Sequence, residues 1–131
     1  MLRQFRWVSL VLMVGLLLGL TWPARAAAHP ESESALTWLR TGRIADAPIQ
    51  NPDGGFVNGF TPVSDLGATV EVMLAGVAAG VDVNMWRSAE GRTAMDFVSA
   101  QVQSGVVTDT ARLSRAVFAS VVSGLDPRAI G

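Results

Sequence analysis

Apolar residues recur at helical spacing in four stretches of the chain, and the clearest stretch runs from about residue 65 to residue 79. Its apolar positions fall on one face of a helix: Leu66, Val70, Met73, Leu74 and Val77. Ser64 or Asp65 can cap the start of this helix and Gly80 can end it, because both side chains accept bonds from free amides and glycine adopts the closing left-handed turn. The remaining faces are mostly apolar or small, which predicts burial on several sides.

The other three stretches predict helices near residues 30–41, 93–103 and 109–123. Thr93 stands at the start of the third helix, and Thr108 or Asp109 stands at the start of the fourth, where their side chains can cap free backbone amides. The sequence therefore predicts an all-α fold over residues 29–131.

Residues 43–62 connect the first two predicted helices and contain three prolines and three glycines. Both residue types interrupt regular elements, so the sequence predicts a long irregular connection. A turn-forming cluster lies at its centre, Gln50-Asn51-Pro52-Asp53-Gly54-Gly55-Phe56. The two glycines permit a tight left-handed turn, and Phe56 can then cover the helix ends.

The second and fourth predicted helices correspond to one another at an offset of 44 residues, which superposes Asp65 on Asp109. The same offset superposes Met73, Leu74, Ala75 and Val77 on Val117, Phe118, Ala119 and Val121, and Gly80-Val81-Asp82-Val83 on Gly124-Leu125-Asp126-Pro127. The first and third helices correspond at an offset of 59, which superposes residues 35–39 on residues 94–98. The sequence thus predicts two helical hairpins, the first with an elaborated loop.

This series resembles a known repeat: an Ala-Leu-x-aromatic-Leu helix, a Gln, Asp-Gly-Gly-Phe, an Asp-led apolar helix and a closing Gly-Val-Asp. Over residues 34–126 it is similar to the α/α repeat of the prenyltransferase and squalene oxidase (terpenoid cyclase-like) proteins. The resemblance implies a structural repeat motif of Gln50, Asp53, Gly54, Gly55 and Phe56, in which Gln50, Gly54 and Phe56 tie the end of one helix to the start of the next. Phe56 stands where the family carries Trp, and the second hairpin lacks the motif. Family toroids close a ring with more hairpins than these two, so the resemblance implies an open, incomplete toroid.

The first 28 residues have the layout of a secretory signal peptide. Arg3 and Arg6 precede an apolar run from Trp7 to Leu20, and the small residues of 24–28 fit the cleavage pattern. The apolar run is shorter than the about 20 residues of a membrane span. We expect an N-terminal signal helix that is cleaved from an exported protein, secreted, periplasmic or at the cell surface. An uncleaved membrane anchor is the alternative.

Without residues 1–28, seven arginines and eleven acidic residues remain, a net charge of −4, and the chain has no lysine. The absence of a basic cluster argues against nucleic acid as a partner. The absence of cysteine excludes disulfides and thiolate metal sites, and His29 is the single histidine, so no metal site or cofactor is evident.

Enzymes of the resembled superfamily use an Asp-x-Asp-Asp acid or a zinc ion held by Asp, Cys and His, and this chain contains neither set. We therefore expect no catalytic residues. Asp53 with Asp65 is the nearest pairing of carboxylates, and we expect them to serve as a turn residue and a helix cap.

Two hypotheses about function remain. The first is an exported, noncatalytic module that binds a hydrophobic or corrinoid-type ligand or a partner protein. Its candidate contact residues are Phe56, Phe60 and Trp86, because aromatic side chains supply large contact area at little entropic cost. Sealing the hairpin ends is their alternative role. The second hypothesis is a shortened relative or fragment of a terpene cyclase or prenyltransferase-type enzyme.

Two hairpins are few for a repeat protein, since roughly three repeats are usually needed for independent stability. We therefore also expect self-association, through the second predicted helix or through a face of the fourth.

Overall fold

Capping side chains start three helices in the part of the chain that the structure, a computed structural model, describes: residues 30–44 and 46–131. Asp65 accepts a bond from the Ala68 amide and Asp109 accepts one from the Arg112 amide, each at 2.8 Å. These caps satisfy amides that have no partner inside a helix. The predicted signal peptide and His29 lie outside the described residues.

Four α-helices occupy the described residues: α2 (Pro30–Thr41), α3 (Leu66–Ala78), α4 (Ala94–Gln103) and α5 (Thr110–Val122). Each bound lies within one residue of the range that the sequence predicts. Two single-turn 3-10 helices follow α3 and α5: η1 (Val83–Met85) and η2 (Pro127–Ala129). The prediction of a mainly helical fold is confirmed.

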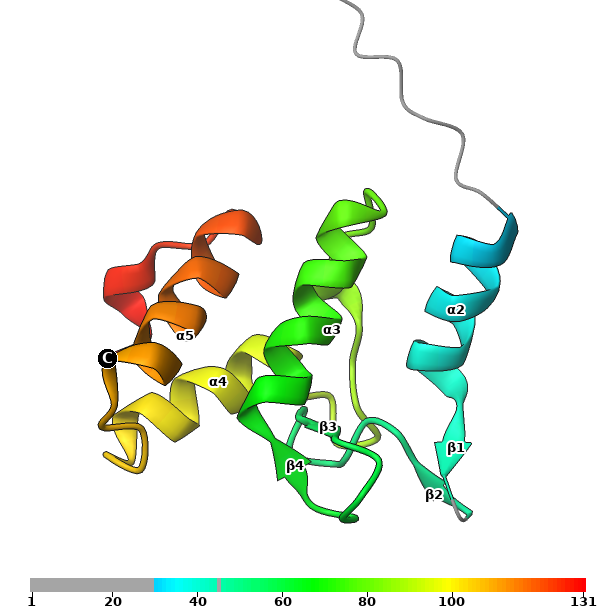
Figure 1. The fold of residues 1–131 in the computed structure, drawn as a ribbon, viewed down its shortest axis with the longest axis horizontal. Helices are drawn as coiled ribbons and strands as arrows, with labels where there is room; N and C mark the ends of the chain where they lie inside the picture. Colours follow the sequence, from blue (N-terminus) through cyan, green and yellow to red (C-terminus); the bar gives the residue numbers. More distant parts are fainter. Residues whose placement is uncertain (1–29, 45) are drawn as a thin grey trace, which may run out of the picture.

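Helix α3 lies at the centre of the described fold, between α2 and α5 in the view of Figure 1. It packs against both α4 and α5, and α5 is its most extensive helical contact. Met73 and Val70 of α3 and Val98 of α4 are among the most deeply buried side chains of the core. Within one chain, α3 is thus buried on its core side, while Glu71, Ala75 and Ala78 stay exposed.

Helix α5 repeats helix α3 at the offset of 44 residues. Both helices have 13 residues, and both end in a glycine with positive φ, Gly80 at 74° and Gly124 at 76°. Asp82 and Asp126 then cap η1 and η2 in the same way, each accepting from the amide two residues later at 3.0 Å. The second and fourth predicted helices thus have the same local structure from cap to turn.

At the offset of 59, residues 35–39 of α2 correspond to residues 94–98 of α4, and both stretches are helical. The two helices differ in how they pack. Helix α2 has no buried residue and makes too few contacts with α3 to form a closely packed hairpin. Polar and charged residues occupy most of its positions, so only Leu36 and Leu39 pack against the core from this helix. The first predicted hairpin is therefore corrected to a loosely attached helix.

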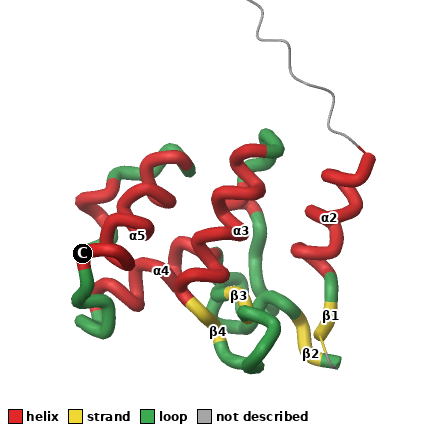
Figure 2. The backbone as a smooth tube through the Cα atoms, viewed as in Figure 1, coloured by secondary structure: helices red, strands yellow, loops and turns green. Residues whose placement is uncertain are grey.

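The prediction of a purely all-α fold is also corrected, because the connection before α3 contains two short antiparallel strand pairs (Figure 2). Strand β1 (Arg43–Ile44) pairs with β2 (Ala47–Pro48), and β3 (Phe56–Val57) pairs with β4 (Ser64–Asp65). Gln50 and Phe56 form one further bridge. Buried backbone groups need partners, and a connection that folds back on itself satisfies them by pairing strands.

The turn cluster of residues 50–56 is fixed by its own side chains. Gln50 Nε2 donates to the Gly54 carbonyl at 3.1 Å, and Asp53 Oδ1 accepts from the Gly55 amide at 3.0 Å. Asp53 Oδ1 also accepts from Ser64 Oγ at 2.6 Å, which joins the turn to strand β4. The cluster therefore forms a closed unit just before α3.

Phe56 joins this unit to the first turn of α3. Its amide donates to Thr69 Oγ1 at 2.9 Å, and the Thr69 hydroxyl donates in turn to the Asp65 carbonyl at 2.7 Å. The side chain of Phe56 is 1 % exposed, and Thr69 is fully buried. Because these hydrogen bonds are buried, water does not compete for them, and they fix the position of the cluster on the helix.

Gly54 joins the same unit to the start of α4. Its φ is +91°, and a Cβ atom at this position would lie 2.1 Å from the Thr93 carbonyl oxygen. Thr93 caps α4 in a capping box with Asp96: Thr93 Oγ1 accepts from the Asp96 amide at 3.1 Å, and the Thr93 amide donates to Asp96 Oδ2 at 2.7 Å. Glycine is required at position 54 because the backbone of the turn packs directly against the backbone of Thr93, the N-cap residue of α4.

None of the helices in the described part of the chain has the length and apolar character needed to span a bilayer.

We predict that Gly54→Ala destabilises the protein by at least about 3 kcal/mol, because the new Cβ must displace backbone in addition to adopting an unfavourable φ. Gly59→Ala is the matched control. Its φ is +83°, and no atom lies within 4 Å of its added Cβ, so only the dihedral penalty of about 1–2 kcal/mol applies. Urea denaturation of both variants measures the difference, and equal losses would contradict the close approach.

We predict that Asp96 makes stability depend on pH. The hydrogen bond from the Thr93 amide lowers the pKa of the Asp96 carboxyl, although partial burial acts in the opposite direction. The folded state then binds this proton less readily than the unfolded state, so the contribution is present above about pH 4 and is lost as pH falls through the folded pKa. Asp96→Asn keeps an acceptor but does not titrate. Denaturation between about pH 6 and pH 2 should show a shallower acid loss in this variant, and an unchanged pH profile would contradict the prediction.

Candidate functional site

The three aromatic residues that the sequence marks as contact candidates lie in different environments. Phe56 is buried in the core, Trp86 is 6 % exposed, and Phe60 is 93 % exposed. Phe56 is bonded to α3, and Trp86 follows η1 as Ile130 follows η2, where both residues are buried. Phe56 and Trp86 are therefore core residues. Of the three aromatic candidates, only Phe60 faces solvent.

The loop that carries Phe60 is braced by two asparagine side chains. Asn58 Oδ1 accepts from the amides of Phe60 and Thr61 at 2.9 and 3.1 Å, which forms a turn at the base of the aromatic residue. Asn51 Nδ2 donates to the Pro62 carbonyl at 3.2 Å and to Ser64 Oγ at 3.0 Å. The turn cluster at residues 50–56 thereby holds the far side of the loop.

An apolar groove lies between this loop and the β1–β2 pair. Its volume is about 280 Å³. The lining residues carry no charge: Ile44, Ala47, Pro48, Val57, Gly59, Phe60, Thr61 and Pro62. Ile44 and Ala47 come from one strand pair, and Val57 comes from the other. Burying such surface excludes water from apolar groups, so the groove favours an apolar occupant.

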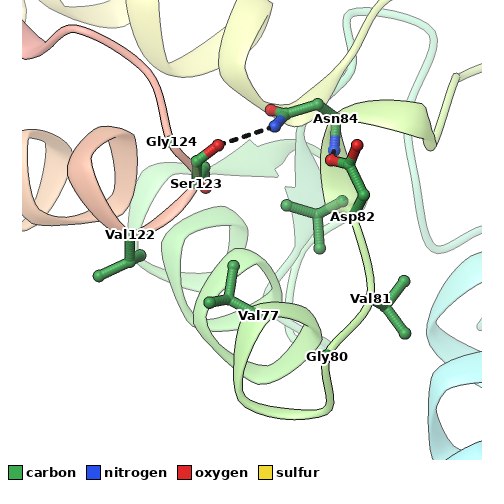
Figure 3. A pocket seen from close by; sticks show the side chains of 9 residues that line it. Val77, Gly80, Val81, Asp82, Asn84, Val122, Ser123 and Gly124 are labelled. Atoms are coloured by element: carbon green, nitrogen blue, oxygen red, sulfur yellow. Dashed lines mark hydrogen bonds between the residues drawn. The ribbon is translucent and has the colours of Figure 1, made fainter. Parts of the chain in front are cut away.

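A second hollow lies between the C-terminal ends of α3 and α5 (Figure 3) and has a volume of about 330 Å³. Val77 of α3 and Val122 of α5 face it from opposite sides. Asn84 Nδ2 donates to the Ser123 carbonyl at 3.1 Å across it, and the Asp82 carboxylate caps η1. Its polar groups thus hold the two helix ends together.

Asp53 and Asp65, the carboxylate pair that the sequence singles out, both have local hydrogen-bond partners. Asp53 is engaged by the turn and by Ser64, and Asp65 caps α3, as the sequence predicts. Within residues 30–44 and 46–131, no group of three His, Cys, Asp or Glu side chains is arranged to hold a metal ion.

The sequence could have separated Phe60 from the other two aromatic residues. Trp86 lies 44 residues before Ile130, so the repeat assigns both to the same apolar position behind a 3-10 turn. Phe56 directly follows the two glycines that bring the chain against α3 and α4. Phe60 has neither a buried equivalent in the second repeat nor a pair of glycines directly before it. The groove beside it could not be predicted, because it depends on the β1–β2 pair.

Comparison of the chain with protein-family models, with curated proteins and with solved structures gives no significant match in any of the three.

Proposed function

We propose that the protein is an exported, noncatalytic binding module, and that its groove beside Phe60 accepts an apolar group of a hydrophobic small molecule or of a partner protein. The observation that carries this proposal is Phe60 itself, a phenylalanine 93 % exposed on a braced loop at the edge of an apolar groove. Full burial of such a side chain contributes about 1.5–3 kcal/mol, which is available to any partner that covers it.

The bracing of the loop supports a binding role. Association loses affinity when flexible segments must be ordered, and the bonds from Asn51 and Asn58 order this loop in advance. A loop that only connects β3 to β4 does not need an aromatic residue at its tip. The bonds therefore present Phe60 at little further entropic cost.

The volume of the groove defines the size of the occupant. Small-molecule pockets usually measure about 300–1,000 Å³, and this groove measures about 280 Å³. It suits an aromatic ring or an aliphatic chain of a few carbons, whereas a corrinoid would extend far beyond it. The uncharged lining gives no partner for an ionic head group.

The engagement of Asp53 and Asp65 in the turn and the cap favours this binding role over a shortened terpene cyclase or prenyltransferase. Export and the resemblance to the squalene oxidase type of repeat remain part of the proposal as predictions from the sequence.

We predict that the chain, expressed in full and purified as the cell processes it, binds indole at this groove. Titration followed by NMR should shift the amide signals of Ile44, Val57 and Phe60. Phe60→Ser should weaken the binding by about tenfold, which is about 1.4 kcal/mol of lost contact.

Phe118→Ser is the matched control, because it removes an exposed phenylalanine from α5, away from the groove. It should leave the indole affinity unchanged. Signals that shift mainly elsewhere, or an affinity that Phe60→Ser does not alter, would contradict the proposed site.

A further inference from the structure

Helix α5 exposes an apolar face that continues into the turn after it. Val117, Phe118 and Val121 are between 43 and 56 % exposed, and Leu125 is 38 % exposed. None of these residues is charged. A cluster of large apolar side chains in contact with water marks a surface that another molecule covers.

The repeat shows what covers this face on the equivalent helix. At the offset of 44 residues, Val117, Phe118 and Val121 correspond to Met73, Leu74 and Val77 of α3. Met73 is fully buried, and Leu74 and Val77 pack against the core, in the region where α4 and α5 contact α3. The first repeat is thus covered by the second repeat, and the second repeat lacks an equivalent neighbour among the described residues.

The opposite side of the repeat shows the complementary difference. Ala119 of α5 is fully buried, whereas its equivalent on α3, Ala75, is exposed together with Glu71 and Ala78. Of the α5 equivalents of Glu71, Ala75 and Ala78, Ala119 is fully buried, Val122 is half-buried and Arg115 is exposed at the edge, so the centre of this strip corresponds to a part of α5 that helix packing covers. We propose that a second copy of this chain docks head to tail, with its Glu71–Ala75–Ala78 strip on the open α5 face of the first.

The charges on the two surfaces are complementary. Within one chain, Arg115 Nη1 of α5 lies 3.7 Å from Glu71 Oε1 of α3, and these two residues occupy equivalent positions in the two repeats. Stacking a second copy in the same way places Arg115 of the first copy opposite Glu71 of the second. Opposite charges therefore meet again, whereas two α5 faces packed on one another would bring like charges together.

A polar contact at the helix ends is also preserved. Asn84 donates to the Ser123 carbonyl at the C-terminal end of α5 (Figure 3). The equivalent pair between copies is Arg128 of the first copy and the Ala79 carbonyl of the second. Arg128 carries several donors and is highly exposed, and Ala79 is the C-cap of α3, where carbonyls lack helical partners and favour a cation.

Head-to-tail contacts use two different surfaces, so a pair of copies still has one free α5 face and one free α3 strip. Such an interface generates closed rings or open chains of copies, and it does not stop at a two-fold dimer. The groove beside Phe60 belongs to neither surface, so this inference is independent of the proposed binding function.

Two single substitutions test the proposal. Val121→Glu places a charge on the α5 face, and Ala75→Glu places one on the α3 strip, both at exposed positions. In sedimentation velocity of the full chain, from about 1 to about 100 μM, the wild type should form species larger than dimers. Each variant alone should associate at least about tenfold more weakly. An equimolar mixture should form heterodimers, because each variant retains the surface that the other has lost.

Val106→Glu is the control, since Val106 is an exposed valine in the turn before α5 and outside both surfaces. It should assemble like the wild type. Circular dichroism checks that each variant is folded, and Phe118→Ser replaces Val121→Glu if that variant unfolds. A monomeric wild type at about 100 μM overturns the proposal. So does an Ala75→Glu variant that dimerises by itself, which would indicate a two-fold contact between α5 faces.

Discussion

The packing of α3 against α5 is the contact on which the rest of the described structure depends. It covers much of the apolar face of α3, and the separate packing of α3 against α4 lets one turn bind the starts of both helices. The turn does so through Phe56, whose amide bonds to Thr69, and through Gly54, which approaches Thr93 more closely than any side chain allows. Burial of apolar surface stabilises the folded state, and the hydrogen bonds of the turn fix how the helices are placed relative to one another.

Sequence reasoning located the helices because their ends carry strong local signals. Asp65 and Asp109 cap two of them in the predicted way, and the offset of 44 residues holds from these caps to the turns that start at Gly80 and Gly124. The strand pairs were missed because two-residue strands are too short to show an alternating pattern. The first hairpin was predicted wrongly because spacing shows that α2 has an apolar side but does not show whether another helix lies close to it. For Trp86 the sequence left a contact role and a sealing role open, and its burial, like that of its repeat equivalent Ile130, agrees with sealing.

The two exposed apolar surfaces that carry the proposals arise in different ways. Phe60 is exposed because local hydrogen bonds hold its loop away from the core, so this surface depends on the connection before α3. The α5 face is exposed because no further helix of residues 30–44 and 46–131 packs on it. The groove beside Phe60 suits a small apolar group, and the α5 face suits the α3 strip of a second copy of the chain. The resemblance to the prenyltransferase and squalene oxidase repeat stays a prediction, and neither proposal requires it.

Hydrogen–deuterium exchange at two protein concentrations tests the central position of α3 most directly, because amide exchange reports the local free energy of opening. We expect the slowest exchange in α3, fast exchange in α2, and slower exchange in α5 at the higher concentration. Exchange in α2 as slow as in α3, with no effect of concentration on α5, would contradict the central position of α3.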